Sequence, residues 1–289
     1  MTDRFEIPKS SDAFPSHLRQ FEWCPDMLYG RGDPGVLRRG VGIIGARKAT
    51  PYGLKAASTI ARWCAELDVP VYSGAAIGCD QAAHKGALEG QGATVAVLGC
   101  GADIIYPASA TGLFADIVKE GCVLSHFTWG TRPKRYTFIE RNRLIVAFSY
   151  VLVVVEGRMP SGTFSAVNWA EQLNVDIAAV PGSIFSPESS GPNHLVSNGA
   201  VPLCTRSDLR DALALTIDYE DDCQVKAQHV GLSRDEKVIF EMLRSLPLSV
   251  DEVARMTQMT TITVLVSVNM LELKGLVTRL PDGRFLAVD

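Results

Sequence analysis

The chain has 289 residues, of which 47% are apolar and 21% are charged, and this composition excludes a protein that is disordered throughout. The formal net charge of −4 excludes a protein coated uniformly in basic charge, but it leaves room for a local basic site. The longest apolar run, residues 144–155, is shorter than the about 20 residues that a membrane span needs, so we expect no contact with a membrane.

The first residues, MTDRFEIPKSSD, contain no apolar stretch ahead of their first charges. The sequence therefore predicts no signal peptide and a cytoplasmic protein. The seven cysteines include no CxxC pair, and the five histidines are scattered. This spacing is unlike that of a zinc site, and the odd number of cysteines indicates reduced thiols. We expect neither a metal ion nor a cofactor.

Along the chain, residues 1–40 are interrupted by four prolines and are predicted to be irregular. From residue 41, short β-rich segments alternate with segments of helical periodicity. The predicted strands are 41–45, 69–73, 93–98, 123–127, 150–156 and 175–181, and the predicted helices are 52–67, 78–89, 112–119, 143–148 and 163–173. Strands that are apolar on both faces indicate a mostly parallel sheet covered on both sides. The sequence thus predicts an α/β, Rossmann-like doubly wound domain over residues 41–215.

The last part of the chain has a different composition. Residues 216–231 are acidic and polar, which predicts a linker. Residues 232–289 contain three helical segments, over 232–247, 249–257 and 260–275, and Ser249 and Glu252 have the spacing of a capping box. A final segment turns on Asp282-Gly283 and predicts a hairpin. Three helices and a hairpin predict a small C-terminal winged-helix domain over residues 232–289.

In parallel α/β sheets, ligands bind at the carboxyl ends of the strands, so the loops that follow the strands hold the candidate site. After the first strand, Gly45 lets backbone N–H groups approach a phosphate and Arg47 adds a fork of donors. A tight turn with two solvated cations explains this loop equally well. After the strand that ends at Glu156, residues 160–163 open a helix as an anion cradle, with a plain N-cap as the alternative.

Two other loops invite catalytic interpretations that the sequence does not favour. Asp80 and His84 lie one helical turn apart, and a capping aspartate with a separately satisfied histidine explains them better than a catalytic pair. The segment that begins at Gly99 lacks the third glycine of a dinucleotide fingerprint and predicts a structural loop.

Residues 132–143 contain five cations, one anion and two aromatic residues. Single-stranded nucleic acid requires this combination, because its phosphates pair with cations and its splayed bases stack on rings. The alternative is a solvated basic loop with Phe138 in the core. In a chain of negative net charge, this concentration of cations favours nucleic-acid binding.

The third helical segment of the tail is different. A recognition helix that reads DNA should present arginine, lysine, asparagine or glutamine on one face. Residues 260–273 offer only Asn269. A protein-contact module is therefore favoured over groove binding for the tail.

Six blocks of the sequence, in this order, resemble the DNA-processing protein A (DprA, Smf) family. They are VGIIGARKATPYG, YSGAAIGCDQAAHKGAL, AVLGCGADIIYP, FIERNRLIVAFS, VVVEGRMPSGTFSA and AAVPGSI. The likeness extends from about residue 14 to residue 213, and the acidic linker and the tail resemble the C-terminal part of the family.

The resemblance implies an extended Rossmann fold that binds single-stranded DNA as a homodimer, without catalysis. It also implies that the protein helps to load RecA recombinase during natural transformation. Carried over residue by residue, it implies DNA contacts at Gly45, Arg47, Lys134, Arg135, Phe138, Arg141, Asn142, Arg143, Ser161, Gly162 and Thr163. Two departures remove donors: Ile77 stands where the family usually has arginine, and Ala46 where serine is usual.

The competing function is a nucleotide-binding enzyme. The same fold superfamily includes nucleoside-5′-monophosphate phosphoribohydrolases, whose active site resembles the pattern PGGxGTxxE. Ala166 stands where that pattern has the carboxylate. Since hydrolysis needs a general acid or base there, we expect no such activity. A module that senses nucleotides or DNA remains open beside the DNA-binding interpretation.

Overall fold

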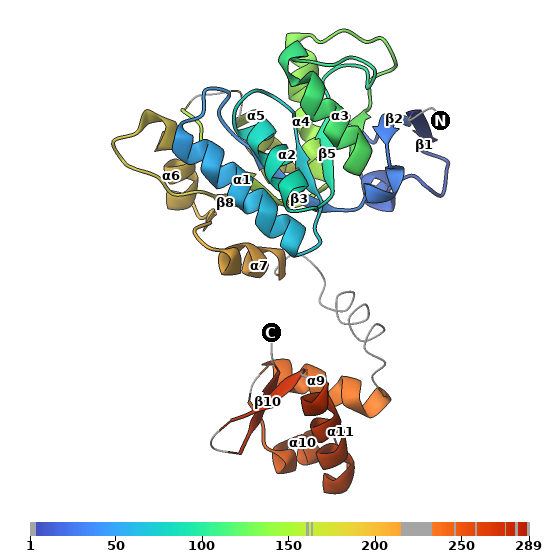
Figure 1. The fold of residues 1–289 in the computed structure, drawn as a ribbon, viewed down its shortest axis with the longest axis vertical. Helices are drawn as coiled ribbons and strands as arrows, with labels where there is room; N and C mark the ends of the chain where they lie inside the picture. Colours follow the sequence, from blue (N-terminus) through green and yellow to red (C-terminus); the bar gives the residue numbers. More distant parts are fainter. Residues whose placement is uncertain are drawn as a thin grey trace. The chain divides into compact units, whose positions relative to one another are not determined.

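The computed structural model describes residues 4–159, 162, 164–214, 233–245, 247–257, 259–274, 276–280 and 283–287. The chain divides into two compact units, Met1–Ile217 and Asp218–Asp289 (Figure 1). The predicted acidic linker over residues 216–231 lies outside the described residues.

A nine-stranded sheet runs through the first unit in the order β1-β2-β6-β5-β4-β3-β7-β8-β9. Its strands are β1 (Arg4–Pro8), β2 (Met27–Gly32), β3 (Gly40–Ile44), β4 (Val71–Ser73), β5 (Thr94–Val97), β6 (Cys122–Ser125), β7 (Ser149–Val154), β8 (Asp176–Ala179) and β9 (Val201–Pro202). From β6 to β9 all neighbours pair in parallel, whereas β2 is antiparallel to both β1 and β6. The strand order reverses between β3 and β7, which is the topological switch point of a doubly wound sheet.

Helices cover both faces of this sheet, as the apolar strands predict. In β7, Leu152 and Val154 belong to the core under α4 (Arg135–Ala147) and α5 (Phe164–Leu173). Val151 and Val153 face the opposite core, under α1 (Pro51–Glu66), α2 (Cys79–Glu89) and α7 (Arg206–Ala214). In Figure 1 the helices α1, α2 and α3 (Thr111–Glu120) lie in front of the sheet. The Rossmann-like fold is confirmed.

The first forty residues are not irregular, in contrast to the prediction. They form β1 and β2, which extend the sheet at one edge, and two short 3₁₀ helices. Phe14, Leu18 and Leu28 are buried in the same core as α4. Proline does not prevent these strands because Pro8 is the last residue of β1 and Pro25 precedes β2. The sheet of the first unit therefore begins at Arg4 rather than at residue 41.

Two further differences concern helices. The helix expected over residues 143–148 begins at Arg135, because the charges of α4 obscure its apolar periodicity. Between β8 and the end of the first unit, α6 (Ser190–Ser197), β9 and α7 were not anticipated from the sequence pattern.

The second unit has a winged-helix architecture. It consists of α9 (Arg234–Ser245), α10 (Val250–Thr257), α11 (Thr261–Leu273) and the antiparallel pair β10 (Val277–Arg279) and β11 (Phe285–Ala287). At the start of α10 the Ser249 N–H donates to Glu252 Oε2 (2.8 Å) and the Glu252 N–H donates to Ser249 Oγ (3.3 Å), which confirms the predicted capping box. No helix in the described parts of either unit is long and apolar enough to cross a membrane.

Candidate functional site

The candidate site lies at the carboxyl edge of the sheet, at the switch point between β3 and β7. The loop after β3 exposes Arg47 and Lys48. Glu156, which follows β7 and is only 1% exposed, holds this loop in place. Its carboxylate accepts hydrogen bonds from the N–H (2.9 Å) and the hydroxyl (2.6 Å) of Thr50, the N-cap of α1. The two loops at the switch point are thus tied together.

Gly45 has a packing role at this point. A Cβ on Gly45 would lie 2.6 Å from the sulfur of Cys79, the buried first residue of α2. This close approach requires glycine whether or not a phosphate binds there. The ligand role predicted for Gly45 stays a prediction.

Phe138 lies where three chain segments meet. Its ring is half-buried rather than in the core. The guanidinium carbon of Arg47 is 5.7 Å from the ring centroid, and the ring of Tyr106 is 5.5 Å away. A Cβ on Gly99 would lie 2.9 Å from the ring. The loops after β3 and β5 and the first helical turns of α4 therefore surround one aromatic side chain.

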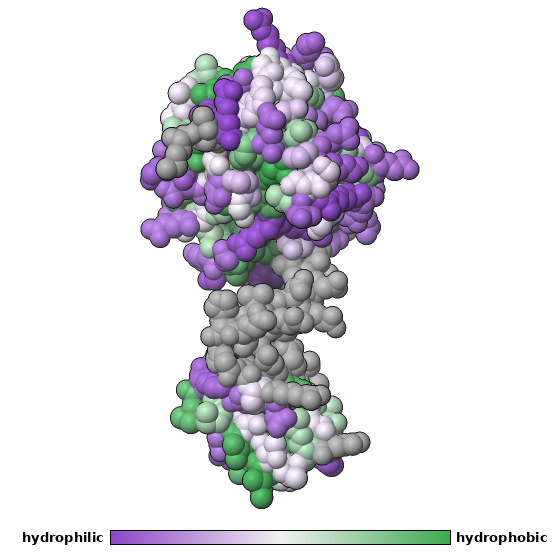
Figure 2. Space-filling model, turned by 90° about the vertical axis from the view of Figure 1, so that its right-hand side faces the viewer, coloured by the Kyte–Doolittle hydropathy of each residue, from purple (hydrophilic) through white to green (hydrophobic). Residues whose placement is uncertain are grey.

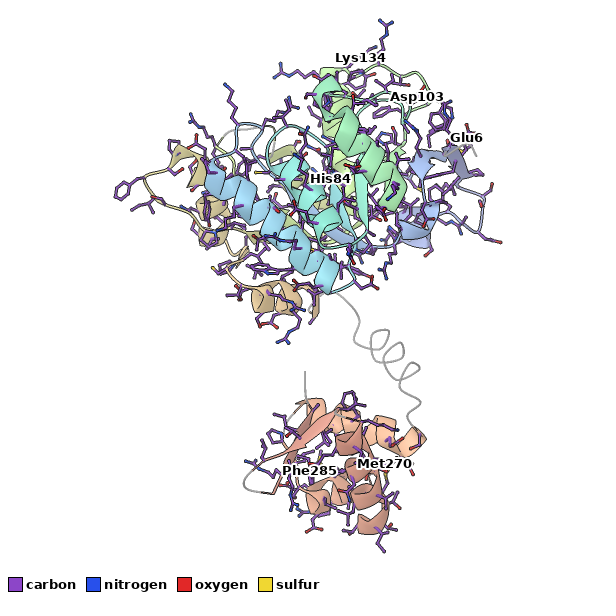
Figure 3. The ribbon with its side chains drawn as sticks, in the orientation of Figure 1. Glu6, His84, Asp103, Lys134, Met270 and Phe285 are labelled. Atoms are coloured by element: carbon purple, nitrogen blue, oxygen red, sulfur yellow. The ribbon has the colours of Figure 1, made fainter. Side chains whose placement is uncertain are left out.

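The start of α4 presents positive charge. Lys134, Arg135 and Tyr136 are exposed, and Lys134 Nζ is 6.0 Å from the Tyr136 ring centroid. Figure 3 shows Lys134 at the outer end of α4. The buried Thr137 hydroxyl contacts the carbonyl oxygens of Gly99 (2.5 Å) and Lys134 (2.7 Å), which fixes this end of the helix against the loop after β5.

Arg141 does not lie with the exposed cations. It is 4% exposed, and its Nη1 donates to the carbonyl oxygens of Gly74 (2.6 Å) and Val97 (2.6 Å). Burial lowers the pKa of Arg141, while the nearby Asp80 acts in the opposite direction. This interior position differs from the surface position that a phosphate contact requires. The guanidinium instead joins α4 to the ends of β4 and β5.

Asp80 and His84 each have their own partners, as the sequence indicates. The Asp80 carboxylate accepts from the N–H groups of Gly74 (3.2 Å) and Ala76 (3.4 Å). His84 is fully buried, with Nδ1 2.7 Å from the Thr94 hydroxyl. Burial lowers the pKa of His84 to about 3, and the charge of Arg141 acts in the same direction.

Arg143 and Asn142 lie on other faces of α4. The Arg143 guanidinium carbon is 4.3 Å from the ring centroid of Trp23 and 4.9 Å from that of Trp169, and its Nη2 donates to Glu140 (2.8 Å). These contacts place Arg143 against the N-terminal segment and α5, away from Phe138.

Asn142 connects α4 to the loop before α5. Its Nδ2 donates to the Ser165 hydroxyl (2.8 Å), which in turn donates to the carbonyl oxygen of Gly162 (2.8 Å). Gly162 is exposed. The predicted contacts Ser161 and Thr163 lie outside the described residues.

The structure thus gathers Arg47, Lys134, Arg135 and Phe138 at one edge. Sequence reasoning did not select three further exposed residues in the same loops, Lys48, Arg132 and Tyr136. Their signal was present, because each lies within two residues of a chosen residue in a basic segment. Ile77, where the family usually has arginine, is 54% exposed.

The family model described as DNA recombination-mediator protein A matches residues 6–214, well over half of the chain. The chain belongs to this DNA-processing protein A family. A second model, the DprA winged helix domain, matches residues 226–283. The resemblance seen in the six sequence blocks is therefore confirmed, and the winged-helix fold of the tail has independent support.

Relatives of this family are similar over most of the chain. A putative DNA processing protein DprA of Mycobacterium tuberculosis is 36% identical over 252 residues, which are 86% of this chain and 64% of the relative. The chain therefore spans slightly less than two thirds of that protein. The DNA processing protein DprA of Bacillus subtilis is 31% identical over 72% of this chain and 70% of its own length.

Two solved structures share the fold. DNA processing protein A from Streptococcus pneumoniae superposes with a TM-score of 0.68 at 30% identity, over 72% of this chain and 73% of that one. DNA processing protein A from Helicobacter pylori superposes with a TM-score of 0.66 at 27% identity, over 74% of this chain and 98% of that one. The latter structure is described for its single-stranded DNA binding mode.

Proposed function

We propose that this member of the family binds single-stranded DNA at the carboxyl edge of its first unit. The observation that carries the proposal is the half-buried Phe138 ring, with Arg47 at 5.7 Å and the exposed Lys134 and Arg135 nearby in the chain. A base stacks on such a ring while cations pair with the flanking phosphates. The Helicobacter pylori relative, with its single-stranded DNA binding mode, supports this assignment.

Within this proposal the residues have separate roles. Arg47, Lys134 and Arg135 pair with phosphates, and Phe138 stacks on a base. Gly45, Asn142 and Gly162 border the path of the strand at the switch point, and Ser161 and Thr163 stay predicted contacts. Arg141 acts as a positioning residue, because it holds α4 against the ends of β4 and β5.

The test is titration of the full chain with labelled oligo-dT at several salt concentrations. We expect affinity to fall with salt in a log–log plot, by about 0.7 in slope for each phosphate contact on a single strand. An affinity for duplex DNA that equals or exceeds that for oligo-dT, or no binding of oligo-dT at low salt, would contradict the proposal.

The proposal extends to partners. We infer that the chain acts in the cytoplasm as a homodimer and helps to load RecA recombinase onto single strands during recombination or transformation. The family's description as a recombination mediator supports the recombinase partner. Two sites side by side would raise affinity through effective concentration. Light scattering that gives a monomer mass at tens of micromolar would contradict the dimer.

We further propose that the chain is not an enzyme. Ala166, where a phosphoribohydrolase has its carboxylate, is a fully buried residue of α5. The neighbouring loop contains the carboxylate of Glu156, but this carboxylate is buried and already accepts two hydrogen bonds from Thr50. Release of free base from AMP above the rate without protein would overturn this proposal.

A further inference from the structure

Ile184 and Phe185 are the most exposed large apolar side chains in the described part of the first unit, at 83% and 90%. They lie in the loop between β8 and α6, on the left of Figure 1. Because this loop follows a parallel strand, it belongs to the same carboxyl edge as the candidate site. The exposure of two large apolar side chains to water does not stabilise the fold. We therefore expect a ligand or a partner to cover them.

The turn that carries this pair has a defined conformation. Asn193 of α6 donates to the carbonyl oxygen of Gly182 (3.0 Å) and accepts from its N–H (3.0 Å). The N–H of Phe185 donates to the Ser183 hydroxyl (3.2 Å), and the N–H of Ser186 donates to the Ser183 carbonyl (3.0 Å). These bonds close the turn, and both apolar side chains are exposed on it.

The same loop is tied to the elements that build the candidate site. The N–H of Gly157, just after β7, donates to the carbonyl of Glu188 (2.8 Å). The hydroxyl of Tyr52, in the first turn of α1, donates to the carbonyl of Pro181 (2.7 Å). Since neighbouring strands lie about 4.8 Å apart, β8 is roughly 10 Å from β3 and roughly 19 Å from β5 along the edge. Phe185 is therefore beyond the reach of a nucleotide stacked on Phe138, but within the reach of a longer strand.

A cation follows β7, the strand that lies between β3 and β8 in the sheet. The Arg158 side chain is 65% exposed, and its Nε donates to Glu188 Oε1 (3.1 Å). Its Nη2 also donates to Glu188 Oε1, and because most of the guanidinium side chain is open to solvent, its other N–H groups can meet a phosphate beside that carboxylate. Tyr52, also at this edge, is 52% exposed. The path from Phe138 to Phe185 thus contains both a charge and a second ring.

We propose that Phe185 is a second base-stacking position, which extends the single-stranded DNA path along the carboxyl edge from β5 to β8. This inference rests on the proposed function. A nucleic-acid strand is favoured over a protein partner because the loop is continuous with the proposed DNA site and supplies ring and cation together. Ile184 supports the stacked base from the side.

The experiment compares the full chain with Phe185→Ala on two lengths of oligo-dT, about 4 and about 16 nucleotides, which bracket common single-strand site sizes. We expect Phe185→Ala to lose about fivefold or more in affinity for the long oligonucleotide and to be unchanged on the short one. Phe185→Trp should keep the affinity, and Phe185→Leu should not, because stacking needs a ring. Leu54→Ala, at a 39% exposed position on α1, is the matched control.

The outcomes are separable. Equal loss with Phe185→Trp and Phe185→Leu, or no loss on the long oligonucleotide, would overturn the second stacking position while the short oligonucleotide still reports the first. A fall in the mass of the DNA-free protein on Phe185→Ala would identify the loop as a contact between copies and would also overturn it. Failure of the unsubstituted chain to bind either length would remove the proposed function itself.

Discussion

Each unit contains a helix that its fold could offer to DNA, and the two helices expose opposite chemistry. The start of α4 exposes Lys134 and Arg135 beside a half-buried ring. The third helix of the winged-helix unit, α11, exposes Ile262 (75%), Val266 (58%) and Leu273 (82%). Figure 2 shows hydrophobic side chains at the surface of the second unit. A winged-helix shape alone therefore does not indicate groove binding, because phosphates require accessible cations.

The cations of α4 divide in the same way. Lys134 and Arg135 face solvent, whereas Arg141 is buried and Arg143 lies between two tryptophans. Composition counts all four as equivalent, but only the first pair is free to meet a phosphate. The first unit thus separates cations that are exposed to solvent from cations that hold the fold together, and only the exposed ones are proposed to contact DNA.

The largest effect is expected from Arg141→Ala. Its removal leaves the carbonyls of Gly74 and Val97 without their donor and the buried Asp80 without its nearby positive charge, so the free energy of unfolding should fall by about 3–5 kcal/mol. Chemical denaturation measures the loss. Arg135→Ala, which removes an exposed cation six residues earlier, should stay within about 0.5 kcal/mol. Similar losses in the two variants would show that Arg141 is not structural.

The second prediction concerns pH and separates the two units. Burial lowers the pKa of His84 from 6.5 to about 3, so the unfolded chain binds its proton more readily than the folded one. The contribution of neutral His84 to the free energy of unfolding is therefore fully present above pH 6.5. It declines as pH falls toward 3, by up to about 1.4 kcal/mol per pH unit. Burial also lowers the pKa of His17 and of His126, each to about 4, in the same direction.

Tryptophan fluorescence isolates the first unit, because all four tryptophans lie within it. In the second unit, hydrogen bonds from Ser249 lower the pKa of Glu252, so that contribution is lost only below its ordinary value of 4.5. Melting followed by fluorescence should therefore move to lower temperature between pH 6.5 and 5. A melting temperature that stays constant over this interval would count against the buried neutral histidine. So would a dependence of melting temperature on pH that is the same in His84→Asn as in the unsubstituted chain.

The third prediction concerns Phe138. Substitution by alanine should weaken the binding of oligo-dT by about 1–3 kcal/mol. The salt dependence of binding should not change, because the phenylalanine ring is uncharged. Since the ring is half-buried, a melting curve of Phe138→Ala shows how much of the change is lost stability. A large melting loss with unchanged affinity would make the ring part of the core instead.

The fourth prediction removes charge from the start of α4. Lys134→Ala and Arg135→Ala should each flatten the log–log salt dependence by about 0.7 and weaken binding to all sequences alike. Lys119→Ala is the matched control, because Lys119 is exposed at the end of α3, just before β6 and thus at the opposite edge of the sheet. If all three substitutions change the slope equally, the edge has no special role.

The smallest effect is expected in α11. Asn269→Ala removes an exposed side chain of a type that can read bases, and Val266→Ser changes the apolar surface of the same helix. Neither should change affinity for oligo-dT by more than about twofold, because neither removes a cation. A tenfold loss, about 1.4 kcal/mol, would show that the second unit contacts DNA and would end the contrast between the two helices.

Several features of this protein could be predicted from local patterns. The apolar residues of β7 predicted helices on both faces of the sheet, and the spacing of Ser249 and Glu252 predicted the start of a helix. The loops after β3 and β5 and the start of α4 were expected at one edge because parallel strands end together. The prediction failed for residues 1–40, where β2 pairs antiparallel with the distant β6 and β1 pairs antiparallel with β2.

The sequence by itself determined the fold class, the family and the edge of the sheet where positive charge and aromatic rings gather. Only the tertiary structure decided which cations remain accessible. Arg141 is bound by carbonyl groups 67 and 44 residues away in the chain, and Phe138 rests against Gly99 in another loop. Periodicity is a local property, whereas the burial of a charge depends on partners brought together by long-range packing. For that reason one basic segment supplies both the surface proposed for DNA and an internal support of the fold.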